Sequence, residues 1–159
     1  MTTNADRQSR PGLKSGRTSE FTLFFNVKPG EGEQIRAVFQ QPGFEDKRKE
    51  MLARIGTLHD ARWVLFDDDT RLMFATNFDG DWDAYIDDFA ALVPETFDAI
   101  LQHTEDYPGI HDPNIKDLIV AHQAQAASYL RAIPDSTVKE LKKALRVQEA
   151  FQRLLDEAG

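Results

Sequence analysis

Most of the residues that could do chemistry fall in one stretch, Leu58 to Gly80, which has the pattern of two strands joined by an acidic turn. Polar residues stand where a buried strand would be apolar: His59, Asp60 and Arg62 on the first strand, and Asn77 on the second. Arginine and asparagine can donate hydrogen bonds to a substrate oxygen, and histidine and aspartate can transfer protons. These residues therefore either line a site or form the solvated face of an ordinary sheet.

The register of this hairpin decides which side chains share a face. A turn at residues 68–69 places Asp60 directly opposite Asn77, with Arg62 diagonal to it. His59 then falls on the other, more apolar face, which we expect the helices to cover. A shift of one residue would exchange the two faces and bring His59 into the site instead.

The face without helices has the composition of a small-molecule pocket, which is mostly apolar with a few polar groups. Besides the polar hairpin residues, we expect four ligand-binding residues on it. They are Phe24, Asn26, Phe66 and Met73. An Asp–Arg pair on a sheet face is also a common structural ion pair, and an asparagine near a strand end often bonds to a turn. The structural interpretation of Asp60, Arg62 and Asn77 therefore stays open beside the functional one.

The apolar pattern of the rest of the chain predicts the elements that position the hairpin. They are a strand at 21–27, helices at 31–41 and 44–55, hairpin strands at 58–67 and 70–78, a helix at about 81–103 interrupted at Pro94, a short helix at 114–123 and a long helix at 137–157. Residues 126–133 fit a strand or a helix by pattern alone. With a strand there, the order is the β-α-β-β-α-β of a ferredoxin-like sandwich. We therefore predict an α+β fold with a four-stranded antiparallel sheet and an extra C-terminal helix.

Length and composition indicate one globular domain. The chain has 159 residues, of which 41% are hydrophobic and 29% charged, which suffices for a hydrophobic core. Residues 1–19 are basic, rich in small polar residues and nearly free of large apolar ones, so we predict a disordered N-terminal tail. The single domain is then expected over residues 20–159.

Charge and residue usage argue against several classes of function. A net charge of −8 disfavours a nucleic-acid partner. No apolar run approaches the roughly 20 residues that a membrane span needs. There is no apolar signal segment after Met1, so we expect a cytoplasmic protein. Without cysteine there is no thiolate chemistry, and the four histidines lack metal-binding spacing, so no metal site is predicted.

The first strand and helix resemble those of the dimeric α/β-barrel superfamily. The resemblance lies in the strand end Val27–Gly30 (VKPG), in Ile35-Arg36 and in Phe39, and it covers roughly residues 21–133. It implies a ferredoxin-like fold and a homodimer that closes over the helix-free sheet face, where ligands bind. Such a partner would also cover the apolar residues of that face, which would otherwise form an exposed patch.

The hairpin, LHDARWVL with ATNFDG, is similar to bacterial sequences associated with dye-decolorising peroxidases. Those enzymes carry a G-x-x-D-G motif with a distal acid. This chain keeps Asp79-Gly80 but has Thr76 at the first glycine, and no proximal histidine follows at a convincing place. We therefore predict no cofactor and expect Asp79 to cap the next helix. A haem-binding, peroxidase-like protein stays an alternative, because haem needs a single proximal histidine.

Two functions from different classes fit these observations. One is a small-molecule-binding enzyme, a cofactor-independent oxygenase or isomerase acting on an apolar or aromatic substrate. The resemblance then implies that Asn26, Arg62 and Asn77, joined by His59, polarise a substrate oxygen. Asp60 would orient Arg62. The other is a non-catalytic accessory or ligand-binding protein that docks on a partner enzyme. An acid–base group inside the pocket would favour the enzyme.

Overall fold

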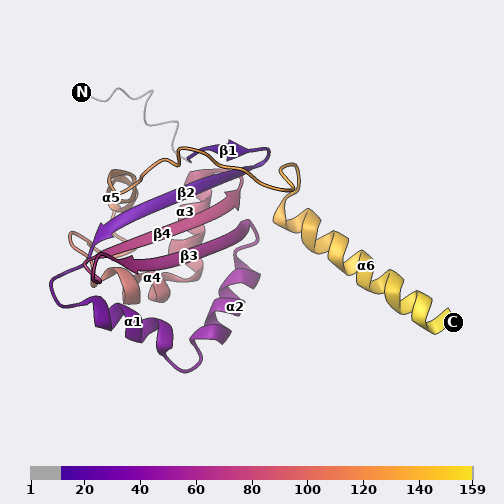
Figure 1. Cartoon of the computed structure of the whole chain (residues 1–159), viewed down its shortest axis with the longest axis horizontal. Coiled ribbons are helices and arrows are strands. Elements are labelled where there is room, and N and C mark those ends of the chain that lie inside the picture. Colours follow the sequence, from indigo (N-terminus) through magenta and orange to yellow (C-terminus); the bar gives the residue numbers. More distant parts are fainter. Residues whose placement is uncertain (1–11, 159) are drawn as a thin grey trace.

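The computed structural model describes residues 12–158 and has a four-stranded antiparallel sheet at its centre (Figure 1). The strands are β1 (Lys14–Ser15), β2 (Thr18–Asn26), β3 (Leu58–Phe66) and β4 (Arg71–Asp79). They lie in the order β1-β2-β4-β3, and every neighbouring pair is antiparallel. β3 is therefore an edge strand, with β4 on one side only.

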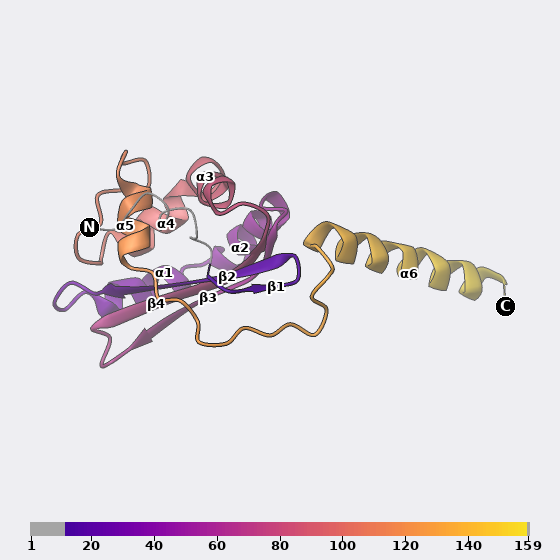
Figure 2. The same cartoon turned by 90° about the horizontal axis from the view of Figure 1, so that it is seen from above.

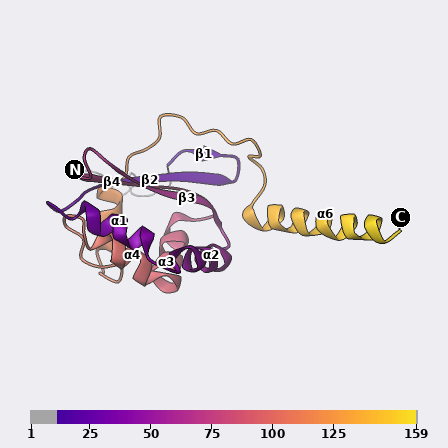
Figure 3. The same cartoon turned by 60° about the horizontal axis from the view of Figure 1, so that its bottom comes forward.

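Helices cover one side of this sheet. The covering helices are α1 (Gly32–Gln40), α2 (Phe44–Arg54), α3 (Trp82–Leu92), α4 (Pro94–Leu101) and α5 (Ile115–Ala121), and a sixth helix, α6 (Val138–Ala158), follows them in the chain. Figures 2 and 3 show α1 to α5 on the same side of the sheet, while α6 projects away from the rest of the molecule. The predicted interruption at Pro94 is confirmed, because the proline begins α4, where its missing N–H costs nothing.

Alternation along the strands places large apolar side chains against the helices. The centre of this core is formed by Phe21, Leu23 and Phe25 of β2, Leu72, Phe74 and Phe78 of β4, and Trp82, Tyr85 and Phe89 of α3. Phe78 stacks on Tyr85, with ring centroids 4.1 Å apart. Each such buried side chain contributes about 1.5–3 kcal/mol, so the core fixes the sheet against α3.

The predicted hairpin register is confirmed, with one local change. Asp60 pairs with Asn77 as expected, but the register shifts between Leu58 and Asp60. Leu58 pairs with Phe78, and His59 is an extra residue in the ladder. Such a β-bulge re-aims a side chain. The prediction that His59 lies beneath the helices is wrong, because the bulge directs it to residues of the helix-free face.

The fourth strand is not the one predicted. Residues 126–133 form neither strand nor helix, and β1 completes the sheet from the other end of the chain. The outer edge of β2 is shared between two segments. β1 pairs with residues 18–19, and residues 122–124 form backbone hydrogen bonds of 2.9 and 3.0 Å to Thr22 and Phe24. The α+β class with a four-stranded antiparallel sheet is confirmed, but a strand at 126–133 is wrong because the edge it would join is already occupied.

A buried glutamate ties together the two segments that share this edge. Glu20 Oε1 accepts hydrogen bonds from the backbone N–H groups of Leu13 (2.9 Å) and Ala126 (3.1 Å). Its Oε2 accepts one from the Thr22 hydroxyl (3.2 Å). Since Glu20 is only 4% exposed, these three donors compensate the cost of burying a carboxylate.

The end of the predicted disordered tail lies in the sheet. Lys14–Ser15 forms β1, and Thr18 and Ser19 of β2 are buried, so the prediction is wrong for residues 12–19. Residues 1–11 lie outside the described residues. Gly16, in the turn between β1 and β2, has φ +63°, which a glycine adopts without strain. A Cβ there would lie 2.1 Å from the carbonyl oxygen of Pro134, so the turn also packs closely against the C-terminal segment.

The segment before α6, residues 125–137, crosses the helix-free side of the sheet (Figures 2 and 3). We call it the strap.

The long helix predicted at 137–157 is confirmed as α6. Among the described helices, none combines the length and the apolar character that crossing a membrane requires. A single domain over 20–159 stays a prediction.

Replacing Gly16 by alanine tests the close packing of the turn. We expect Gly16→Ala to lower the free energy of unfolding by about 3 kcal/mol, because it adds a clash with the Pro134 carbonyl to the cost of a positive φ. Gly30→Ala is the matched control, since Gly30 has φ +78° but nothing within 4 Å of the added carbon. It should cost only about 1–2 kcal/mol. Urea unfolding measures both, and equal losses would contradict the packing of the turn.

Candidate ligand-binding site

A cavity of about 350 Å³ lies between α2 and the helix-covered face of the sheet. Its apolar lining comes from α1, α2, α3, α4 and the two hairpin strands. These residues are Phe39, Phe44, Met51, Ala61, Trp63, Phe74, Phe89 and Phe97. The volume and the aromatic lining are those of a small-molecule site.

Trp63 is the centre of the aromatic wall. Its ring centroid lies 4.3 Å from that of Phe74, 5.7 Å from Phe97 and 6.4 Å from Phe39. Phe39 in turn meets Phe44 edge to face at 5.5 Å. A planar apolar molecule entering the cavity would therefore meet ring faces and ring edges, the contacts that aromatic groups prefer.

The α2 helix covers the cavity without filling it. None of its residues is buried, and only Phe44 and Met51 are partly buried against the core. The other helices of the covered side each contribute at least two buried residues. Few buried apolar contacts mean a low free energy of local opening. Of the helices on this side, α2 is thus the one that a ligand can displace most easily.

The polar part of the cavity lining is mainly cationic. Lys47 and Arg48 come from α2 and Arg62 from β3, and Glu45 supplies the single carboxylate among the lining residues. Glu45 is paired with Arg48 at 2.8 Å. Three cations against one acid leave a local charge of +2 in a chain whose net charge is −8. Such a site favours a ligand that carries a negative charge or a polarisable oxygen.

The residues proposed from the sequence are mostly on the other face of the sheet. Of that set, Arg62 alone is among the lining residues of the cavity. It belongs by alternation to the helix-free face, but β3 is an edge strand, so its long side chain also borders the cavity. On the helix-free face, Asn77 Nδ2 donates a hydrogen bond of 2.8 Å to Asp60 Oδ1. The structure thus brings these two together as a pair that is not part of the cavity lining.

The four expected ligand-binding residues also belong to the helix-free face by strand alternation. Phe24 and Phe66 meet edge to face at 6.0 Å, and the Arg71 guanidinium lies over both rings, 5.6 and 4.9 Å from their centroids. Met73 is partly buried beside them, paired in the ladder with Phe24. Asn26 is exposed at the end of β2. Their role in ligand binding stays a prediction.

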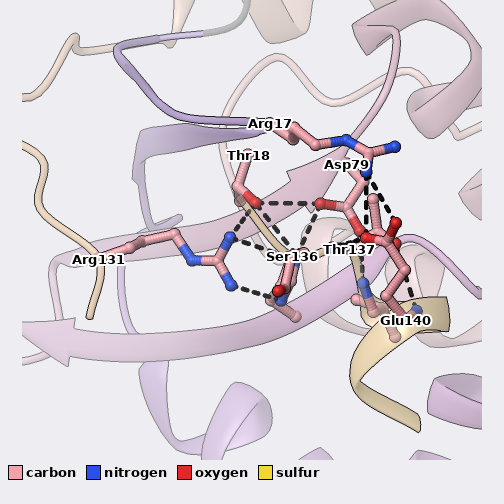
Figure 4. A network of polar contacts seen from close by, with 9 residues as sticks. Arg17, Thr18, Asp79, Arg131, Ser136, Thr137 and Glu140 are labelled. Atoms are coloured by element: carbon pink, nitrogen blue, oxygen red, sulfur yellow. Dashed lines mark hydrogen bonds and ion pairs between the residues drawn. The ribbon is translucent and has the colours of Figure 1, made fainter. Parts of the chain in front are cut away.

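His59 belongs to a buried polar network at one end of the helix-free face, part of which is drawn in Figure 4. Its Nε2 lies 2.7 Å from Asp79 Oδ1, and Thr18 donates to the same oxygen at 3.0 Å. Arg131 of the strap bonds to His59 Nδ1 at 3.1 Å and also to the Thr18 hydroxyl. Because a guanidinium can only donate, Nδ1 accepts this hydrogen bond. Nε2 therefore carries the ring proton and donates a hydrogen bond to Asp79. Both ring nitrogens of His59 are therefore engaged.

Asp79 binds the last helix, not the next one. Its Oδ2 accepts a 2.8 Å hydrogen bond from the backbone N–H of Val138, at the start of α6. The expectation that Asp79 caps the following helix is wrong, since Asp81 occupies the N-cap of α3. The residue of this network that the sequence analysis did not identify is Arg131, a lone cation in a segment of ambiguous pattern. Nothing in its sequence context indicated that it reaches the strand ends.

The first turn of α6 has further anchors, which Figure 4 shows beside Asp79. Thr137 and Glu140 form a capping box, in which Glu140 Oε2 accepts from the Thr137 N–H at 2.8 Å and the Glu140 N–H donates to the Thr137 hydroxyl at 3.3 Å. Arg17 donates to both Glu140 oxygens at 2.9 and 3.1 Å. The hydrogen bonds from Thr137, then that from Arg17, lower the pKa of Glu140 to about 2. The start of α6 is therefore fixed to β4 and to the turn before β2.

Comparison with known proteins gives similarities of structure only. No family model matches the chain, and no curated protein matches it in sequence. Tetracenomycin F2 cyclase of Streptomyces glaucescens, a type-II polyketide cyclase, is 16% identical with a TM-score of 0.47, over 71% of this chain and 97% of that one. Proteins described as antibiotic biosynthesis monooxygenases from Bordetella bronchiseptica and Nitrosomonas europaea are 10% and 11% identical, with TM-scores of 0.42 and 0.43. They cover 56% and 60% of this chain and 87% and 86% of their own. Similarities this weak carry neither the reaction nor the site of those proteins to this chain.

Removing the Asp79 carboxylate tests the network. We expect Asp79→Ala to lower the free energy of unfolding by about 3 kcal/mol, because it leaves buried donors of Thr18, His59 and Val138 without their acceptor. Asp81→Ala is the matched control, since Asp81 is exposed and makes no side-chain cap bond, and it should cost only about 0.5 kcal/mol. Chemical denaturation measures both. Equal small losses would show that the network does not stabilise the fold.

Proposed function

We propose that this protein binds a small aromatic molecule with an anionic or carbonyl oxygen, in the cavity between α2 and the sheet. The observation that carries the proposal is the aromatic cavity of about 350 Å³ with a cationic border. Pockets of roughly 300–1,000 Å³ that are mostly apolar, with a few placed polar groups, are typical of small-molecule sites. The rings around Trp63 supply the apolar surface, and Lys47, Arg48 and Arg62 supply the polar groups.

Binding is better supported than catalysis. An enzyme of the expected kind needs an acid–base group at the substrate. His59 has both ring nitrogens engaged outside the cavity, and Asp60 is bonded to Asn77 on the other face. Within the cavity lining the only carboxylate is Glu45, which is paired with Arg48. These placements favour a ligand-binding or accessory protein.

A cofactor-independent oxygenase or isomerase is the second candidate. The observation that favours it is the cationic border, since positive groups stabilise an enolate or other oxyanion. Proton transfer would then fall to Glu45, and Glu45→Gln should abolish turnover while binding is kept. A haem enzyme would need an axial ligand, and none of the four histidines is among the cavity-lining residues, so the proposal involves no haem at this site.

Calorimetric titration with 2-naphthoate and 2-naphthylmethanol tests the proposed ligand class. We expect the anionic compound to bind at least ~10-fold more tightly, a difference of about 1.4 kcal/mol, because the border is cationic. The double variant Lys47→Ala with Arg48→Ala should remove this preference. The double variant Lys49→Ala with Arg54→Ala is the matched control, because both residues are on the same helix, exposed, and outside the cavity lining. Binding of neither compound would contradict the proposal, and an equal loss in the control would contradict the role of the border.

We also propose that two copies associate through the helix-free sheet face. Val64 is 39% exposed there, beside the partly buried Phe24, Phe66 and Met73, and such a patch favours a partner. A second copy is the simplest cover for it, as the superfamily resemblance implies.

Thiol labelling tests this association, because the chain has no cysteine of its own. We expect Val64→Cys to react with a maleimide at least ~10-fold more slowly in concentrated than in dilute protein, because a partner subunit would cover residue 64. A tenfold difference in the accessible fraction corresponds to about 1.4 kcal/mol. Leu52→Cys, at an exposed apolar position on α2, should react at the same rate in both. A rate for Val64→Cys that does not depend on concentration would contradict the sheet-face dimer.

A further inference from the structure

The α6 helix carries a long apolar face that its own chain leaves exposed. Its large apolar residues Leu145, Val147, Phe151, Leu154 and Leu155 are each between 49% and 60% exposed. Helical spacing puts them, with Leu141, on one side of the helix. Figures 1, 2 and 3 agree that α6 points away from the sheet and the other helices. An exposed apolar surface of this kind marks an interaction site.

The order of charges along α6 is unfavourable for an isolated helix. Residues 138–147 hold four cations and one acid, a net charge of +3, and residues 148–158 hold three acids and one cation, a net charge of −2. The helix dipole favours acids at the N-terminus and cations at the C-terminus, so this order is unfavourable in both halves. The order becomes favourable when an oppositely directed copy of the same helix lies alongside, because each basic half then faces an acidic half.

We propose that α6 is a self-association helix that pairs antiparallel with the α6 of a second copy of this chain. The 21 residues of α6 form three heptads and a rod of about 32 Å, long enough for a continuous helix–helix contact. A parallel pair would place like charges side by side. In the antiparallel pair, Lys142 and Lys143 lie near the end of the partner that carries Asp156 and Glu157. This contact is separate from the cavity and from the sheet face.

The polar side of α6 argues against a lipid surface as the partner. Helices that bind anionic membranes are rich in Lys and Arg over their whole polar face. Here Glu149, Asp156 and Glu157 stand on the polar side of the C-terminal half. Those acids would repel the lipid headgroups along half of the helix, whereas they complement a second α6.

Exchanging charges between two variants tests the pairing in the full chain. All variants carry Val64→Arg, so that the sheet face cannot hold the copies together. We expect the parent, which carries Val64→Arg and an unchanged α6, to have twice the monomer mass of 18.1 kDa by light scattering at low salt. The acidic variant, K142E with K143E, and the basic variant, D156K with E157K, should each be monomeric. Their equimolar mixture should regain the dimer mass, because only the mixed pair brings opposite charges together.

A matched control separates the charge pattern from net charge. R146E with R153E changes the net charge by the same amount as K142E with K143E, but it leaves the two halves of α6 with opposite signs. It should remain dimeric. Orientation is read by oxidising an equimolar mixture of A144C and L155C chains, which place the cysteines on the apolar face and should form a disulfide between copies that neither variant forms alone. Circular dichroism verifies that every variant keeps its helix content.

The remaining outcomes would overturn the proposal. A monomeric parent, a mixture that stays monomeric, or acidic and basic variants that dimerise as the parent does would exclude antiparallel pairing. A disulfide formed by A144C alone would show a parallel pair. Sedimentation of the parent with anionic phosphatidylserine vesicles, without dimerisation, would show that α6 binds membranes instead.

Discussion

The carboxylate of Asp79 is the point at which separate parts of this molecule are joined. It lies at the end of β4 and accepts hydrogen bonds from Thr18 of β2, from His59 in the β3 bulge and from Val138 at the start of α6. A buried carboxylate is costly unless donors fill its oxygens, so these three groups must come together there. The bulge at His59, the entry of β2 and the attachment of α6 therefore depend on one electrostatic constraint.

The cavity exists because the helix that covers it, α2, has too few apolar residues to fill the space beneath it. β3 is an edge strand, and Trp63 presents its ring to the space beneath α2. The sequence of α2, FEDKRKEMLAR, has Phe44, Met51 and Leu52 as its only large apolar side chains. A helix with a full apolar stripe would pack onto Trp63 and fill the space. The polar composition of α2 thus both preserves the cavity and places Lys47 and Arg48 at its border.

The sequence was sufficient for features set by local pattern and insufficient for those set by distant partners. Alternation and the acidic turn predicted the pairing of Asp60 with Asn77 correctly, because strand period and turn position fix a register. The bulge at His59 and the exclusion of residues 126–133 from the sheet depend on Arg131, Glu20 and β1, which are far apart in sequence. The cavity was missed for another reason, since the residues around Trp63 have the pattern of an ordinary core.

The engagement of His59 also limits what chemistry this fold can do. Arg131 occupies Nδ1, and Nε2 donates a hydrogen bond to Asp79, so His59 could act as a base only after its contact with Arg131 of the strap is broken. Catalysis and the contact with the strap would then compete for the same side chain. A cavity that is separate from this network avoids the conflict, because a ligand can enter beneath α2 while every donor to Asp79 stays in place. The separation of the two sites is thus the physical reason why the cavity is the proposed binding site and His59 is assigned a structural role.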